Sequence, residues 1–289
     1  MRKFLAGISL ITVLIVLLYS YLVWKNNASV TALERTEIEA TLENSIQWLE
    51  KNRDSVLDIG NPMLWYMVQQ AADISGDQRL QRLFANYEQR YLKNRSINLW
   101  RPLFYPGSWV GVRFEDISDF PYYNWHFIYA SLCDRDLEKV PEIAIQNNPD
   151  FCDRHPLRPA CVTHQLMGIR LLQRSECGNP AQLDNTVGQL QQRIHRQLLL
   201  DPRVVDVYMQ RVLMLVESGG GDLIKSIWIR NLVDAQQSDG GWSSFDPLVP
   251  LGGDRYFGFG PRIFAVKTPH SDFHMTAQGV LLFSLLTSR

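Results

Sequence analysis

An uncharged, largely apolar run near the start of the chain constrains its fold most strongly. Arg2 and Lys3 are followed by Phe4 to Trp24, 21 residues without a charged side chain. As a helix this run would be about 31 Å long at ~1.5 Å per residue, which matches the ~30 Å hydrocarbon core of a bilayer. We therefore predict a transmembrane signal anchor at residues 1–25, with a membrane bound through residues 4–24. A removed signal peptide is the alternative, although its apolar region is usually only ~7–15 residues.

Charges on either side of this run predict its orientation. Arg2 and Lys3 precede it, and cationic residues tend to stay on the cytoplasmic side of a membrane. The segment 34–39 that follows has a net negative charge. We expect a single-pass protein with a cytoplasmic N-terminus and an extracytoplasmic domain, which is periplasmic in a Gram-negative cell.

The overall charge balance argues against one class of partner. The chain has 29 Lys and Arg against 30 Asp and Glu, a net charge of −1. Because there is no basic excess to attract phosphates, we predict no nucleic-acid partner. We divide the chain into the anchor, a juxtamembrane helix or linker at 26–61, and a main domain at 62–289.

Four cysteines are clustered in the middle of the chain: Cys133, Cys152, Cys161 and Cys177. An even, clustered set in an oxidising compartment indicates two disulfides. Cys152 and Cys161 flank a proline-rich loop that such a bridge would fix, and Cys133 would then pair with Cys177. Ligation of a metal by the four thiolates is the alternative.

The main domain shows a recurring pattern of an apolar segment, a glycine-containing turn and an amphipathic segment. Such a unit is typical of a helical hairpin, and repeated hairpins stack with their apolar helices inside. We therefore predict an all-α fold, an α/α toroid in the form of an incomplete barrel of helical hairpins, with an irregular helical array as the alternative. The expected inner helices are 63–74, 125–133, 163–172, 206–216 and 274–286.

The segment 228–242, WIRNLVDAQQSDGGW, carries a resemblance to a known family. Its Gln-Ser-Asp-Gly-Gly-Trp end and the following helix from His274 resemble the α/α-toroid repeat of the terpenoid cyclase and protein prenyltransferase superfamily. The resemblance covers some 50 residues at the C-terminus, and it implies a fold, not an activity. The aspartate-rich acid motif of triterpene cyclases is absent from the sequence.

Three histidines stand at the predicted starts of inner helices: His126, His164 and His274. If the inner helices run parallel, these starts gather at one end of the barrel, with Asp272 beside His274. Histidine and carboxylate together suit general acid–base catalysis, or a divalent metal such as zinc as cofactor. The alternative is that these histidines merely occupy helix starts and loops. We predict a catalytic site formed by His126, His164, His274 and Asp272.

Two irregular segments flank the predicted helices. Residues 99–127 are rich in aromatic residues and prolines, and such a long loop often covers or forms a binding site; the alternative is a loop that only buries its own aromatics. Residues 245–269 are rich in glycine without a phosphate-loop pattern, so we expect a flexible excursion.

These features favour an enzyme that acts on a polymer or a modified peptide through a histidine-lined barrel mouth. The competing hypothesis is a non-catalytic binding or assembly protein that uses the helical domain as a platform. The ligand would be a polymer, a peptide or a lipid, and the sequence does not choose among them.

Overall fold

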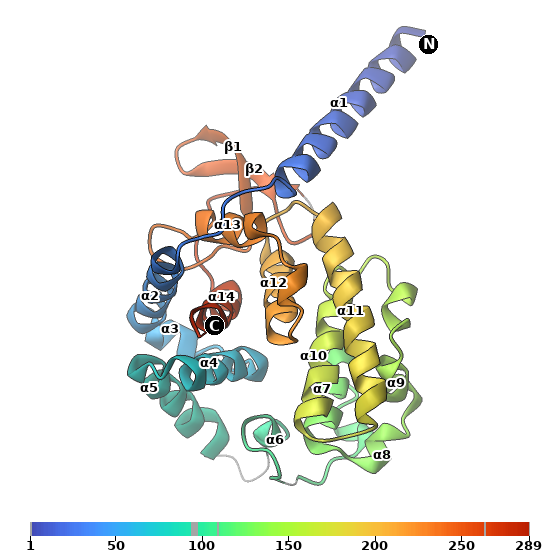
Figure 1. The fold of residues 1–289 in the computed structure, drawn as a ribbon, viewed down its shortest axis with the longest axis vertical. Helices are drawn as coiled ribbons and strands as arrows, with labels where there is room; N and C mark the ends of the chain where they lie inside the picture. The colour runs from blue at the N-terminus through green and yellow to red at the C-terminus, as the bar shows by residue number, and fades with distance from the viewer. Residues whose placement is uncertain (1, 94–97, 109, 263, 289) are drawn as a thin grey trace.

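The computed structural model describes residues 2–93, 98–108, 110–262 and 264–288, with side chains from residue 12 onward. Most of the described residues are helical (Figure 1). The α-helices are α1 (Arg2–Asn26), α2 (Arg35–Lys51), α3 (Arg53–Leu57), α4 (Pro62–Ser75), α5 (Gln78–Tyr87), α6 (Arg101–Phe104), α7 (Tyr122–Leu132), α8 (Arg135–Glu138), α9 (Pro141–Ala144), α10 (Cys161–Arg174), α11 (Pro180–Leu200), α12 (Asp206–Glu217), α13 (Ser226–Asp234) and α14 (Phe273–Thr287). Single turns of other helix types are η1 (Glu88–Lys93), η2 (Phe114–Asp116), η3 (Ile145–Asn147), η4 (Phe151–Arg154) and η5 (Gly221–Leu223).

Five helices form the centre of the domain. Helix α14 packs against α4 and α12, α12 contacts α10, and α10 packs against α7. The short helix α6 contacts both α4 and α7, so it joins the two ends of this series (Figure 1). Helix α14 is buried around nearly its whole circumference from Met275 to Ser284, which agrees with its mostly apolar sequence.

A three-stranded antiparallel sheet corrects the all-α prediction. Its strands β1 (Asp246–Gly252), β2 (Arg255–Phe259) and β3 (Phe264–Lys267) lie in the order β1-β2-β3. They occupy the segment that we expected to be a flexible excursion. The predicted fold class, an all-α toroid, is therefore wrong: the described chain is a mainly helical domain with a small sheet.

Local backbone chemistry explains why this sheet escaped the sequence analysis. Pro247 and Pro250 interrupt the alternation of β1, and they are tolerated because β1 is an edge strand. The hairpin turns at Gly252 and Gly253, whose φ angles of 100° and 57° suit glycine. A Gly-Gly-Asp turn between two apolar runs is typical of a β-hairpin, but we interpreted its glycines as a sign of a flexible segment.

The predicted transmembrane helix is the second correction to the fold class. Residues 2–26 do form one helix, α1. Within the described part of the chain, however, no helix has both the length and the apolar character needed to cross a membrane. The side chains of residues 4–11, the first part of the predicted apolar run, lie outside the described residues.

The end of α1 is attached to the helical domain by several hydrogen bonds, of which those of Asn26 are buried. Asn26 is 3% exposed, and its Nδ2 donates to the carbonyl of Leu198 at 2.7 Å. Its Oδ1 accepts from the hydroxyl of Tyr208 at 2.8 Å, and its carbonyl accepts from Nε1 of Trp228 at 2.9 Å. The side chain and the carbonyl of this one buried residue thus join α1 to α11, α12 and α13.

The segment before the main helical series contributes to its packing. Where we expected one helix, Asn52 separates α2 from α3. Helix α2 packs against α14 and α5. Nε1 of Trp48 on α2 donates to Asp239 at 3.0 Å, and Nε2 of Gln236 donates to the carbonyl of Thr41 at 2.9 Å. The Gln-Ser-Asp-Gly-Gly-Trp segment therefore ties the ends of helices together by hydrogen bonds.

All four cysteines are paired as disulfides. Cys133 is bonded to Cys177, with the Cα atoms 5.5 Å apart, and Cys152 is bonded to Cys161, with the Cα atoms 5.7 Å apart. This pairing confirms the predicted disulfides and excludes thiolate ligation of a metal. The first bridge connects the ends of α7 and α10, and the second closes the loop that leads into α10.

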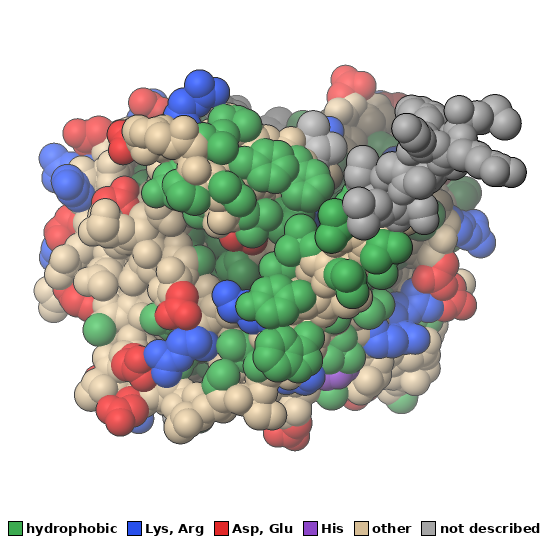
Figure 2. Space-filling view, turned by 90° about the horizontal axis from the view of Figure 1, so that it is seen from above, with side chains coloured by type: hydrophobic (Ala, Val, Ile, Leu, Met, Phe, Trp, Pro, Cys, Tyr) green, Lys and Arg blue, Asp and Glu red, His purple; other side chains and the backbone are tan. Residues whose placement is uncertain are grey.

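One end of the molecule is apolar. Apart from α1, exposed large apolar side chains gather on the sheet: Leu248, Val249, Leu251, Phe257, Phe264 and Val266. The view onto the end that carries α1 and the sheet shows these side chains spread over its surface (Figure 2).

Candidate functional site

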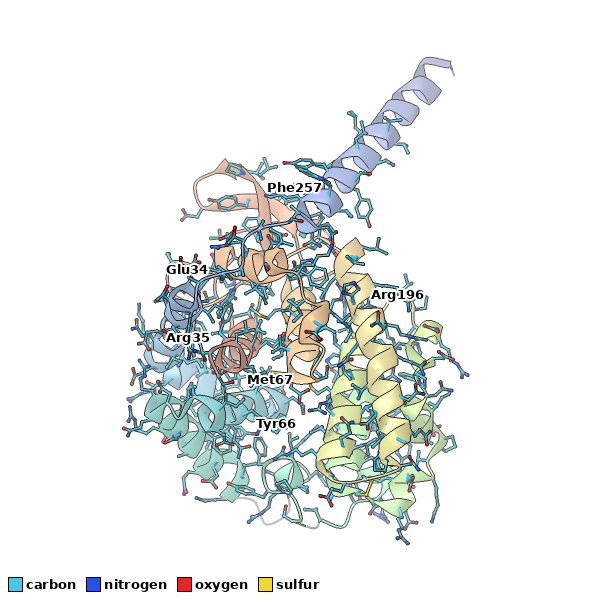
Figure 3. The ribbon with its side chains drawn as sticks, in the orientation of Figure 1. Glu34, Arg35, Tyr66, Met67, Arg196 and Phe257 are labelled. Atoms are coloured by element: carbon cyan, nitrogen blue, oxygen red, sulfur yellow. A yellow bond between two sulfur atoms is a disulfide. The ribbon has the colours of Figure 1, made fainter. Side chains whose placement is uncertain are left out.

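A cavity of about 260 Å³ lies where several central helices begin. The first turns of α4, α10 and α14 reach it, together with α7 and α12. Met67, labelled in Figure 3, lies on α4 and forms part of its wall. The walls of this cavity combine aromatic rings, amides and two histidines: Asn61, Pro62, Met63, Leu64, Met67, Trp100, Phe120, Tyr123, Asn124, Phe127, His164, Met167, Gln210, His274 and Gln278.

Helix capping positions these first turns. Asp272 is the N-cap of α14, and its side chain accepts hydrogen bonds from the amides of Met275 at 2.9 Å and Ser244 at 3.0 Å. Asn61 caps α4 in the same way, accepting from the amide of Met63 at 3.0 Å, and Pro62 occupies the first helical position. Because the cap fixes where a helix begins, it also fixes which face the next residues occupy. Asp272 thus places His274 at the cavity.

Asp206 and His274 form the polar pair of the site. Nδ1 of His274 lies 2.7 Å from Oδ1 of Asp206, which also accepts from Nε2 of Gln278 at 2.8 Å. The three side chains come from two helices, α12 and α14, that pack against each other. A carboxylate at Nδ1 holds the proton there in the neutral imidazole, so Nε2 is left as the basic nitrogen.

The surroundings shift the pKa values of this pair in opposite directions. Burial alone would lower the pKa of His274, but the hydrogen bond to Asp206 and the negative charge of that carboxylate raise it. Burial would raise the pKa of Asp206, and its hydrogen bond and charge interaction with His274 lower it. The His274 side chain is still 46% exposed, so the charged form keeps contact with solvent. The pair therefore stabilises the protonated form of His274 relative to a free imidazole, and the ionised form of Asp206 relative to a free carboxyl group.

His164 differs from His274 in its environment. It stacks on Tyr123, with ring centroids 4.3 Å apart and planes 11° from parallel. Burial lowers the pKa of His164 to about 4. The negative charge of Asp206 opposes this shift, and the positive charge of His274 adds to it. His164 is therefore neutral at physiological pH, and the cavity contains one readily protonated and one neutral imidazole.

The structure brings together only two of the three predicted histidines. His164 and His274 both line the cavity, whereas His126 is fully buried on another face of α7. Its Nε2 lies 2.9 Å from Oδ1 of Asn147, and its ring packs against Gly168 of α10. Burial lowers the pKa of His126 to about 4. The side chains of α7 that reach the cavity are Tyr123, Asn124 and Phe127. At about 100° per residue these three share one face of the helix, and His126 points about 110° away from the centre of that face.

Asp272 acts on the site indirectly. It does not line the cavity: Oδ1 caps α14 at the amide of Met275, and Oδ2 accepts from the amide of Ser244. Its negative charge contributes to raising the pKa of His274. In the structure it positions the helix that carries His274.

A divalent metal such as zinc, which the sequence left open as a cofactor, finds no ligand group among the described residues. That part of the chain contains no group of three or more His, Cys, Asp or Glu side chains arranged to hold a metal ion. The residues that the structure places at the site are an imidazole–carboxylate pair with amides, a set better suited to proton transfer and hydrogen bonding.

Sequence reasoning missed Asp206, Gln278 and Gln210. Gln278 stands four residues after His274 and therefore on the same helix face, a signal that could have been used. Asp206 begins the segment that was already expected to be an inner helix. Gln210 is 3% exposed, with its Oε1 accepting from the hydroxyl of Thr163, and nothing in the sequence around it marks it as part of a site.

Comparisons of the chain with protein-family models, with curated proteins and with solved structures found no match. The resemblance of residues 228–242 to the toroid superfamily therefore stays a prediction from those residues.

Proposed function

We propose that the cavity is the active site of an enzyme in which His274 acts as general base. The observation that carries this proposal is the hydrogen bond of 2.7 Å between Nδ1 of His274 and Asp206 at the wall of a cavity. Asp206 orients the ring, fixes the proton on Nδ1 and stabilises the positive charge after Nε2 has taken a proton. A base with a pKa near the working pH transfers protons most effectively.

The composition of the wall limits the reaction type. Among the described lining residues there is no Ser, Cys or Lys to form a covalent intermediate. We infer that Nε2 of His274 removes a proton directly from water or from a group of the substrate. The neutral imidazole of His164 faces the same cavity and can exchange a hydrogen bond or a proton with the reacting group.

The wall also favours a substrate class. Trp100, Phe120 and Tyr123 offer flat apolar faces, and four amide side chains, Asn61, Asn124, Gln210 and Gln278, offer hydrogen bonds. Lys and Arg are missing from the described wall, so the bound group is neutral and polar. The volume of about 260 Å³ lies just below the ~300–1,000 Å³ that is typical of ligand sites. We propose that one unit of a longer polymer or of a modified peptide enters the cavity.

The two disulfides support a location outside the cytoplasm. Such bonds persist in oxidising compartments and are rare where thiols are kept reduced. We propose that the domain acts there, on a polymer of that compartment.

A comparison of histidine variants tests the proposal. Full-length protein would be incubated with a panel of neutral polysaccharides and peptides, and products would be detected by mass spectrometry. We expect wild type to convert at least one member, and His274→Ala to abolish the reaction with an unchanged helical circular-dichroism signal. His270→Ala is the matched control, because His270 is exposed and contacts only the carbonyl of Thr268 among the described residues. Equal activity of wild type and His274→Ala would reject the catalytic role.

A non-catalytic binding protein is the second candidate. It is favoured by the composition of the described lining residues, which include no Ser, Cys or Lys nucleophile. Their four amide side chains can bind a ligand without reacting with it. This candidate predicts that a panel member binds without conversion, and that Gln210→Leu weakens binding more than His274→Ala does. Equilibrium dialysis of both variants, beside the product analysis, separates the two functions.

A further inference from the structure

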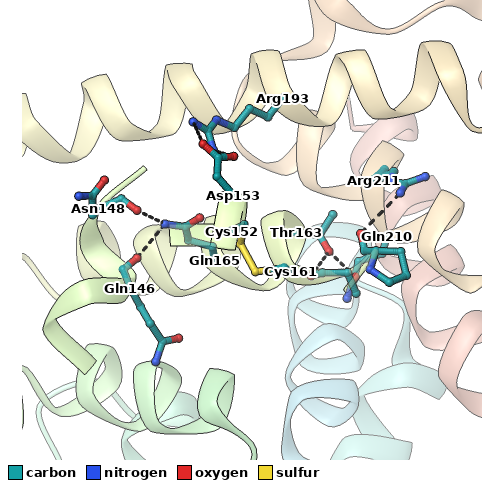
Figure 4. Close-up of a disulfide and its surroundings, with 12 residues drawn as sticks. Gln146, Asn148, Cys152, Asp153, Cys161, Thr163, Gln165, Arg193, Gln210 and Arg211 are labelled. Carbon is teal, nitrogen blue, oxygen red and sulfur yellow. Dashed lines mark hydrogen bonds and ion pairs between the residues drawn. A yellow bond between two sulfur atoms is a disulfide. The ribbon is translucent and has the colours of Figure 1, made fainter. Parts of the chain in front are cut away.

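A second cavity, of about 660 Å³, lies on the other side of α12 from the candidate active site. Gln210 lines the first cavity, and the next residue, Arg211, lines the second. The walls of the second cavity come from the loop closed by Cys152–Cys161, from the C-terminal part of α11 and from the start of α12. The disulfide and its surroundings are shown in Figure 4. We call this space the arginine cavity, after its five lining arginines: Arg158, Arg193, Arg196, Arg203 and Arg211.

Two of these arginines share one carboxylate. Arg203 binds Asp201 through Nε at 2.7 Å and Nη2 at 2.8 Å, and Nη1 of Arg211 binds the same carboxylate at 2.9 Å. The Arg211 side chain is only 4% exposed. The negative charge of Asp246 also helps to raise the pKa of Arg203, so the positive charges on this side of the cavity are largely compensated.

A third arginine is neutralised. Nη1 of Arg193 binds Asp153 at 2.7 Å (Figure 4), and its Nη2 contacts Asp150. The positive charge of Arg193 is therefore more than compensated, because two carboxylates contact this one guanidinium.

The remaining two arginines contact no carboxylate among the described residues. The guanidinium of Arg158 lies 4.8 Å from the ring centroid of Tyr122, and Nε of Arg196 donates weakly to the carbonyl of Gln192 at 3.4 Å. Arg196 extends from α11, as its label in Figure 3 shows. Arg158 and Arg196 are therefore the two guanidiniums of the arginine cavity whose charge no described carboxylate compensates by direct contact.

The wall of the cavity is held in place before any ligand arrives. The bridge between Cys152 and Cys161 closes the loop, and Pro156 and Pro159 restrict its backbone. The backbone that carries Arg158 is thus held in place, and the planar forks of guanidinium groups match the oxygens of a phosphate. The pKa of His155 is lowered, first by burial and then by the positive charges of Arg158 and Arg154. The effect of these two charges indicates a positive potential at this rim.

We propose that the arginine cavity binds a phosphate group. A phosphate monoester carries about −1.5 to −2 charges at pH 7, which matches the two uncompensated guanidiniums. Arg158 and Arg196 bind its oxygens from the rim, and Arg211 faces it from the buried side. This site is independent of the proposed catalytic function, because it shares no described lining residue with the first cavity.

Titration with inorganic phosphate tests the site. Full-length protein in detergent would be followed by phosphorus NMR at constant ionic strength. We expect one phosphate to bind to wild type, and Arg158→Gln and Arg196→Gln each to weaken binding roughly tenfold or more, since each removes a charge-assisted contact. Arg196→Lys should recover only part of the affinity, because an ammonium lacks the planar fork. Arg135→Gln is the matched control for loss of one charge, because Arg135 is an exposed residue of α8, away from the arginine cavity.

A second arm distinguishes a lipid headgroup from a free phosphate. Binding of the full chain to phosphatidylcholine vesicles would be compared with binding to vesicles that also contain phosphatidic acid. A gain with phosphatidic acid that disappears in the Arg158→Gln/Arg196→Gln double variant assigns the phosphate to a lipid. Binding of inorganic phosphate alone assigns it to a soluble compound. The proposal is overturned if neither probe binds, or if Arg135→Gln weakens binding as much as the two cavity variants do.

Discussion

At the scale of single residues, burial and one carboxylate give two nearby histidines opposite properties. Both imidazoles line one cavity, but Asp206 raises the pKa of His274, while burial lowers that of His164 to about 4. The positions of both at helix starts were predictable from the sequence. The position of His126 outside the cavity was not predictable. An apolar segment without a clear polar face does not show which side of its helix faces the cavity.

Replacing Asp206 with Asn should destabilise the protein in a pH-dependent manner. The folded pKa of His274 is raised, so its interaction with Asp206 is fully present below the unfolded value of ~6.5 and is lost as the pH rises through the folded pKa. Because His274 is half exposed, we expect a loss of only about 1 kcal/mol at pH 5 and less at pH 8. Urea unfolding at both pH values measures the difference. Asp234→Asn, an exposed control, should show no such pH dependence.

At the scale of elements, one close approach between α7 and α10 sets the packing beside the site. A Cβ at Gly168 would lie 2.1 Å from Nδ1 of His126, which is fully buried. The sequence pattern predicted both helices but not this contact, because contacts between helices depend on their rotation. The sheet was missed for the opposite reason: glycines and prolines that indicate loops also build edge strands and hairpins.

Gly168→Ala should therefore destabilise the fold by about 1–3 kcal/mol, the usual cost of overpacking a core. At Gly188 on α11, an added Cβ would meet no described atom within 4 Å, so Gly188→Ala should be neutral or stabilising by up to ~1 kcal/mol. Thermal unfolding of the two variants tests the contact. The His126→Ala change in the Gly168→Ala background should restore part of the loss, and a purely additive result would contradict the assigned clash.

At the scale of the whole molecule, disulfides and packing hold the middle of the chain against the central helices. The disulfide pairing was predictable from cysteine clustering, whereas the sheet and the docking of α1 through Asn26 depend on long-range contacts. Such contacts join residues that are far apart in sequence, so local patterns do not predict them.

Removing the disulfide that closes the longer loop should cost more stability, although the cost grows only with the logarithm of loop length. Cys133 and Cys177 are 44 residues apart, and Cys152 and Cys161 are 9 apart. The chain-entropy estimate gives about 4 and about 3 kcal/mol, respectively. We expect Cys133→Ser/Cys177→Ser to lower the free energy of unfolding more than Cys152→Ser/Cys161→Ser does. The reverse order would show that native contacts, and not loop closure, dominate.

The most direct test of the central claim is an NMR titration of the histidines in the full-length protein, assigned with single His→Asn variants. We expect that His274 titrates above pH 6.5, that this value falls in Asp206→Asn, and that His164 stays neutral to about pH 4. A His274 that titrates at or below 6.5 and does not respond to Asp206→Asn would contradict the assigned pair, and with it the general base.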